Sequence, residues 1–203
     1  MRNKYQYLDP DYSYTDPITG VLRNMGGVST QEDLDFIEGV AFLKRSNELI
    51  ENPIKIKDSE TLLVIHHHLF QDVYEWAGKV RTVEISKQGK QFFPSALFGQ
   101  GFAYIDSLIA DYRKIKANDI DALSQSLAII LDSLNFLHPF REGNGRAQRE
   151  FIRHLALEKG YKIDLNPSDN SDIFERYMSG TIDSDIPLLK NLMHELLTKA
   201  GKR

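Results

Sequence analysis

The sequence predicts an all-α protein, a compact bundle of about seven helices with one β-hairpin. Two observations lead to this prediction. Apolar residues recur at helical spacing through most of the chain beyond residue 29, as in Leu62, Ile65 and Leu69. Only the stretch at about 81–93 alternates polar and apolar residues around a turn signal, Gln88-Gly89, so it is the one convincing hairpin.

Each element can be assigned in order along the chain. Residues 1–28 are rich in Tyr, Asp, Pro and Gly, and we expect an extended N-terminal arm laid over the domain. Residues 29–203 are expected to form a single domain. Its first helix should follow a capping pattern that begins at Ser29, with Leu34 and Val40 on its apolar side. The other helices are expected from near Asp58 to Gly78, at 96–116, at 120–137, from the end of a loop at 138–143 to Gly160, at 170–179 and at 186–200. The segment 120–137 is apolar on almost every face, which predicts the central buried helix.

Composition excludes several classes of function. The chain of 203 residues has 25 Lys and Arg against 29 Asp and Glu, a net charge of -4, which argues against nucleic acid as a direct partner. It has no Cys, so disulfides, thiolate metal sites and cysteine nucleophiles are excluded. We see no signal peptide, and no apolar run reaches the roughly 18 residues of a membrane-spanning helix. These observations predict a cytoplasmic protein without a membrane segment, and they leave export as an effector open.

One segment, from His138 to Arg149, carries the chemistry. Gly143 and Gly145 flank Asn144 and permit backbone geometry that a Cβ atom would block. A helix then begins, and its unpaired amides and positive dipole end form an anion site. Arg146 and Arg149 are three residues apart on that helix, so they share a face and suit a ligand with several phosphates.

Two further residues of this segment complete a reaction centre. A carboxylate such as Glu142 would be unfavourable in a pocket that binds only anions. It fits a site in which Mg²⁺ is held by one carboxylate and the substrate phosphates. Histidine side chains ordinarily titrate near neutral pH, so His138 is the candidate general base. The segment therefore predicts phosphoryl or nucleotidyl transfer.

The same segment resembles the signature of the Fic (filamentation induced by cAMP) family, which has a His, a Phe, an acidic residue, Gly-Asn-Gly-Arg and a second Arg at these spacings. All eight defined positions are present. The resemblance covers about residues 15–200 and includes Trp76-Ala77-Gly78 running into Arg81. It implies a Fic-type helical bundle and a protein adenylyltransferase, which moves AMP from ATP to a Ser, Thr or Tyr hydroxyl of a target protein.

The resemblance also implies a role for each residue. His138 deprotonates the hydroxyl, Glu142 holds the Mg²⁺ that bridges the α- and β-phosphates, and Phe140 anchors the loop. The phosphates are held by an anion hole of Asn144 with amides near Gly143 and Gly145, and by Arg146 and Arg149 at the β- and γ-phosphates. Tyr177 is a candidate to flank the adenine, with packing in the core as its alternative. The hairpin is the family's flap, on which the target protein docks by β-augmentation.

The group that is transferred is less firmly implied than the site. In the Doc-like branch, which phosphorylates its target, a Lys stands at the position of Gly145, so this glycine favours AMP transfer. Transfer of UMP, phosphocholine or phosphate, and a non-catalytic protein-binding role, stay open as alternatives.

Regulation is implied by a pattern that the sequence lacks. Many Fic enzymes are inhibited by a helix that carries Ser or Thr, three residues, then Glu and Gly or Asn, and whose Glu pairs with the second motif Arg. The nearest match, Leu34 to Glu38-Gly39, has Leu in the first position, and a built-in inhibitor at this place is the alternative. The resemblance is thus to the stand-alone toxin class inhibited by a separate antitoxin. By analogy with such toxins, the target would be a subunit of a bacterial type II topoisomerase.

The run His66-His67-His68 is a possible metal site by composition. Adjacent residues on a helix point in different directions, so we interpret these histidines as structural.

Overall fold

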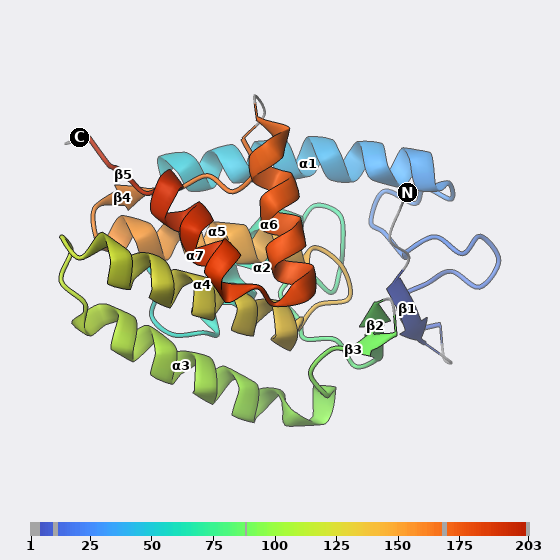
Figure 1. Cartoon of the computed structure of the whole chain (residues 1–203). Helices are drawn as coiled ribbons and strands as arrows, with labels where there is room; N and C mark the ends of the chain where they lie inside the picture. Colours follow the sequence, from blue (N-terminus) through green and yellow to red (C-terminus); the bar gives the residue numbers. More distant parts are fainter. Residues whose placement is uncertain (1–4, 10–11, 88, 168–169, 202–203) are drawn as a thin grey trace. The chain divides into compact units, whose positions relative to one another are not determined.

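The computed structural model describes residues 5–9, 12–87, 89–167 and 170–201, and Gln88 of the predicted turn lies outside these ranges. Within them the chain forms the predicted all-α fold, with seven helices: α1 (Gln31–Glu51), α2 (Thr61–Phe70), α3 (Phe98–Lys114), α4 (Ile120–Leu137), α5 (Asn144–Glu158), α6 (Ser171–Asp183) and α7 (Ile186–Leu196) (Figure 1). The strands are short: β1 (Tyr5–Leu8), β2 (Glu84–Lys87), β3 (Lys90–Gln91), β4 (Tyr161–Lys162) and β5 (Thr198–Lys199).

Contacts divide the chain into two compact units. The first comprises Met1–Ile54, Leu62–Phe98 and His138–Ala147. The second comprises Lys55–Thr61, Gly99–Leu137 and Gln148–Arg203. That residues 1–28 act as an arm and residues 29–203 as a single domain stays a prediction.

In the first unit, α1 and α2 differ from the predicted elements at their ends. The N-cap of α1 is Thr30, whose side chain accepts the amide of Asp33 at 3.2 Å, so the prediction of a Ser29 cap was wrong by one residue. Helix α2 ends at Phe70, not at Gly78. The chain turns back after Phe70, and Gly78, at a φ of +79°, donates its amide to His66 Nδ1 at 2.9 Å.

The predicted hairpin is confirmed, and it belongs to a three-stranded sheet. Strand β2 pairs antiparallel with β3, with Ser86 opposite Gln91. On its other side β2 pairs antiparallel with β1, with Tyr7 opposite Ile85 (Figure 1). The strand β1 was not predicted, because its pairing depends on the open edge that β2 offers and not on a local pattern.

In the second unit, α4 is the central helix. Its residues Leu127, Ile130 and Leu134 are fully buried, and it packs against α6 and α7 (Figure 1). Among the described residues, α4 is the one helix long and apolar enough to cross a membrane by length and composition, although polar residues such as Asp121, Gln125 and Asp132 interrupt it. Its packing is that of a core helix.

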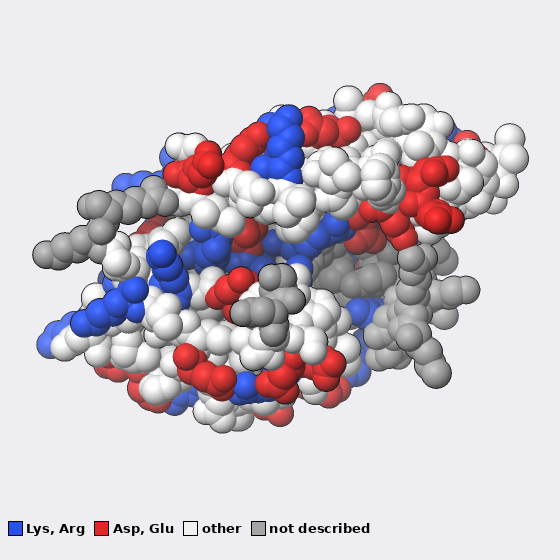
Figure 2. Space-filling view, turned by 90° about the horizontal axis from the view of Figure 1, so that it is seen from above, with Lys and Arg blue, Asp and Glu red and all other residues white. Residues whose placement is uncertain are grey.

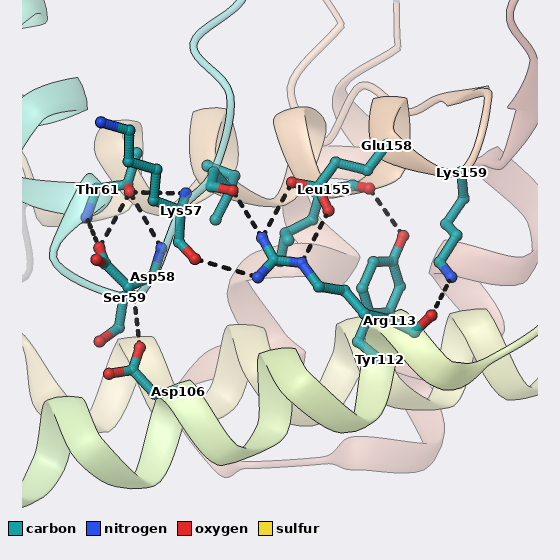
Figure 3. A network of polar contacts seen from close by, with 11 residues as sticks. Lys57, Asp58, Ser59, Thr61, Asp106, Tyr112, Arg113, Leu155, Glu158 and Lys159 are labelled. Atoms are coloured by element: carbon teal, nitrogen blue, oxygen red, sulfur yellow. Dashed lines mark hydrogen bonds and ion pairs between the residues drawn. The ribbon is translucent and has the colours of Figure 1, made fainter.

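A polar network in the same unit fixes residues 55–61 and the C-terminal part of α5 on α3 (Figure 3). Arg113 on α3 donates to the carbonyl of Ile56 at 2.6 Å and pairs with Glu158 at 3.2 Å. Tyr112 donates its hydroxyl to the carbonyl of Leu155 at 2.8 Å. Helix α5, which carries the second half of the predicted motif, is thereby held at its far end.

Candidate active site

His138 begins the motif, directly after α4 ends. It adopts a left-handed conformation with a φ of 44°, which is uncommon for a residue with a Cβ atom. Left-handed residues often end helices, and strained ones concentrate at functional sites. The imidazole is 5% exposed and stacks on the Phe92 ring at 3.8 Å between ring centres, so the hairpin and the candidate base are in direct contact.

Arg81 connects the hairpin to this loop. Its backbone amide donates to the carbonyl of Pro139 at 2.7 Å, and its Nε donates to the carbonyl of His138 at 2.9 Å. Its two terminal nitrogens donate to the carbonyls of Val83 and Phe93, each at 2.6 Å. Burial lowers the pKa of this guanidinium from its ordinary value. The sequence analysis included Arg81 in the family resemblance but gave it no role, because no local pattern shows which carbonyl groups its side chain reaches.

The loop itself is closed by Asn144 and Gly143. The Asn144 side chain accepts the amide of Phe140 at 2.9 Å and donates to its carbonyl at 2.7 Å. Gly143 has a φ of +81°, and a Cβ atom there would lie 2.5 Å from the Phe70 ring. The side chain of Asn144 thus holds the loop, while its predicted part in an anion hole stays a prediction.

His66 supports the loop from α2. Its Nδ1 accepts the Gly78 amide, so the proton is on Nε2, which donates to the carbonyl of Glu142 at 3.0 Å. The ring stacks on Phe140 at 3.7 Å between centres. Burial lowers the pKa of His66 to about 3, which keeps it neutral. Among the described residues, no group of three or more His, Asp or Glu side chains is placed to hold a metal ion.

Glu142 and Arg146 lie next to each other at the start of α5. Glu142 is 34% exposed, and its Oε1 accepts the amide of Gly143 at 2.9 Å and lies 3.6 Å from Arg146 Nη2. Arg146 Nη1 lies 2.7 Å from Oε1 of Glu38, so this look-alike of the inhibitory Glu contacts the first motif Arg. Gly145 is half-buried in the first turn of the helix.

Arg149 and Tyr177 belong to the second unit and contact each other. The Arg149 guanidinium lies 5.2 Å from the ring centre of Tyr177 and 5.4 Å from that of Phe174. In the part of the chain that the structure describes, no carboxylate forms an ion pair with Arg149. Tyr177 is 2% exposed, so it packs in the core, as the alternative interpretation of this residue expects. Its contact with adenine stays a prediction.

The chain is similar to several known proteins. The Fic/DOC family profile matches residues 56–156. The protein adenylyltransferase VbhT of Bartonella schoenbuchensis is 42% identical over 83% of this chain, which spans only 35% of that protein. The probable protein adenylyltransferase y4lH of Sinorhizobium fredii is 33% identical over 88% of this chain and 93% of its own length. A crystal structure of the BepC protein from Bartonella tribocorum, with bound AMPPNP, has a TM-score of 0.82 and 20% identity over 94% of this chain and 98% of that one. The chain belongs to the Fic/DOC family.

Proposed function

We propose that this chain is a protein adenylyltransferase that transfers AMP from ATP to a Ser, Thr or Tyr hydroxyl of a target protein. The observation that carries the proposal is the loop from His138 to Asn144, which is fixed from three directions by Arg81, His66 and Asn144 itself. It leads from a histidine into the amino end of α5. Two relatives that carry the name protein adenylyltransferase support the choice of AMP.

The proposed reaction divides among the residues of the motif. The target hydroxyl oxygen attacks the α-phosphorus, and the His138 imidazole takes its proton. The bond from the α-phosphorus to the bridging oxygen breaks, and pyrophosphate leaves with its electron pair. The backbone amides near Gly143 and Gly145, at the start of α5, donate to the phosphates. The side chains of Arg146 and Arg149 hold the β- and γ-phosphates.

Mg²⁺ is proposed to enter with the nucleotide and not as a resident metal. Within the motif, Glu142 is the carboxylate that directly precedes α5, and Mg²⁺ is commonly bound by one or two carboxylates together with substrate phosphates. When bound, the ion neutralises charge that develops on the phosphates. The half-exposed Glu142 carboxylate, whose neighbour is Arg146, would hold it.

The target is proposed to dock on the flap as an extended segment. Strand β2 is paired on both sides, by β1 and β3, so the target strand would use the outer edge of β3, whose two residues are exposed. Acidic and basic side chains are interspersed over the face in Figure 2, which supports a protein target over a nucleic acid. A type II topoisomerase subunit is the first target to test.

A separate antitoxin is the proposed regulator. The second motif Arg, Arg149, contacts two aromatic rings, and the first, Arg146, is the one that Glu38 contacts. Among the described residues, no carboxylate forms an ion pair with Arg149, whose guanidinium contacts aromatic rings. A Glu supplied by another chain could therefore pair with it. We expect the protein to act in a cytoplasm, that of its own cell or of a cell to which it is delivered.

The proposal is tested by labelling. The protein is incubated with Mg²⁺, cell lysate or purified topoisomerase subunits, and ATP labelled at the α-phosphate. We expect a labelled protein band with the wild type and none with His138→Ala. His194→Ala, which removes an exposed imidazole from α7, is the matched control and should label like the wild type.

Parallel reactions distinguish the alternatives. Label transferred from the γ-phosphate of ATP would indicate phosphorylation, and label from UTP, GTP or CDP-choline would indicate another group. If no nucleotide gives a label that depends on His138, the chain is a non-catalytic binding module and the enzymatic proposal is wrong.

A further inference from the structure

Glu38 of α1 connects two residues that are far from it in sequence. Its Oε1 lies 2.7 Å from Arg146 Nη1, and its Oε2 accepts the hydroxyl of Tyr74. The Glu38 side chain is 14% exposed and Tyr74 is 2% exposed, so this is a largely buried carboxylate with a separate partner for each oxygen. Burial, and then the charge of Glu38, raise the pKa of Tyr74, so its hydroxyl keeps the proton that it donates.

The Arg146 guanidinium is held on further sides. It lies 4.6 Å from the ring centre of Phe70 and 5.4 Å from that of Phe42, two rings that stack on each other at 6.3 Å. Its Nη2 points to Glu142, the proposed metal ligand, at 3.6 Å. Two aromatic rings and two carboxylates thus set the orientation of one cation.

We propose that Glu38 is a positioning residue, which with Tyr74 holds the Arg146 guanidinium in the orientation that receives the polyphosphate of the nucleotide. This inference rests on the proposed function and adds a residue outside the motif to it. Glu38 occupies one terminal nitrogen of Arg146, and the edge that includes Nη2 faces Glu142 and the start of α5.

The contacts favour positioning over competition with the phosphates. A competing carboxylate has to release the Arg when the nucleotide binds, as a mobile side chain can. The Glu38 carboxylate is anchored to a buried tyrosine, and the guanidinium is confined between the Glu38 carboxylate and the rings of Phe42 and Phe70. An Arg that is ordered before binding loses less side-chain entropy when it grips a phosphate.

The test compares nucleotides that differ only in their phosphates. Affinities of the full chain for ATP with Mg²⁺, for ADP with Mg²⁺ and for AMP are measured by calorimetry, for the wild type, Glu38→Gln and Tyr74→Phe. Because Arg146 is proposed to act beyond the α-phosphate, Glu38→Gln should weaken ATP and ADP binding about tenfold, the size of one charge-assisted contact, and leave AMP binding within about twofold. Tyr74→Phe, which removes one hydroxyl and keeps the ring, should shift ATP binding in the same direction by a smaller factor.

Glu48→Gln is the matched control, because Glu48 is also on α1 and pairs with an Arg, Arg45 at 3.0 Å. It should bind all three nucleotides like the wild type. Equal losses for ATP and AMP in Glu38→Gln would mean a general structural role, and tighter ATP binding would mean competition; either result overturns the inference, as does unchanged ATP binding. If the wild type itself binds no ATP, the proposed function fails and this inference fails with it.

Discussion

Gly143 is the position where the loop tolerates the least change, and Gly143→Ala is the sharpest perturbation that the structure offers. The residue has a φ of +81°, and an added Cβ atom would lie 2.5 and 2.6 Å from two atoms of the Phe70 ring and 3.1 Å from His66 Nε2. Phe70 is fully buried, so its ring has no free space into which to move.

Two costs add at this position. The left-handed backbone costs a residue with a Cβ atom about 1–2 kcal/mol. The clash in a packed core adds about 1–3 kcal/mol. Gly160 separates these costs, because its φ is +80° and a Cβ atom there would meet nothing within 4 Å. We expect Gly160→Ala to lower the free energy of unfolding by the first cost alone, and Gly143→Ala by the sum of both.

The assay is urea denaturation followed by circular dichroism, with the free energies of unfolding of the two variants compared under the same conditions. AMP transfer should be retained in Gly160→Ala and strongly reduced in Gly143→Ala, because Phe70 or His66 must shift and His66 holds the Glu142 carbonyl. The reasoning is refuted if the two variants differ by less than about 0.5 kcal/mol, since the clash would then cost nothing.

Three further predictions follow from the site and the core. Burial lowers the pKa of His66 and of His154 to about 3, so below about pH 6.5 the unfolded chain binds protons that the native chain does not. The free energy of unfolding should therefore fall by about 1.2 kcal/mol for each histidine as the pH decreases from 6 to 5. His154→Leu should remove one such contribution from the slope, and an unchanged slope contradicts the assignment. Glu142→Gln should reduce Mg²⁺-dependent AMP transfer about a hundredfold, and chelation of the metal should abolish it in the wild type, as a titration of label against Mg²⁺ will show. Tyr177→Phe should bind ATP within about twofold of the wild type, whereas Tyr177→Leu, which removes the ring beside Arg149, should bind it severalfold more weakly; a large loss in Tyr177→Phe would point to a role of the hydroxyl instead.

The helices and the hairpin were predictable because their signals are local. The period of apolar residues and the turn at Gly89 are properties of neighbouring residues, and α4 spans Ile120–Leu137 as its composition predicts. The end of α2 was mispredicted, because the turn after Phe70 brings Gly78 to His66, a contact that the helical pattern does not contain. The pairing of β1 with β2 joins residues that are far apart in the chain, and so it was missed.

The sequence pattern also did not predict which face of α1 is buried. Val40, expected on its apolar side, is exposed together with Phe36 and Leu43, whereas Leu34 and Leu49 are buried. A helix that is apolar on several faces has no single preferred orientation by periodicity, so the choice depends on what packs against it.

The sequence by itself determined the motif, the family and the chemistry that the motif predicts, because the residues from His138 to Arg149 are consecutive and their spacing on a loop and a helix follows from covalent geometry. Only the tertiary structure decided what holds them. Three contacts hold the motif, and each joins it to a residue far away in the sequence. They are Arg81 with the His138 carbonyl, His66 with the Glu142 carbonyl, and Glu38 with Arg146. Such contacts depend on how the elements pack, and no local spacing specifies them.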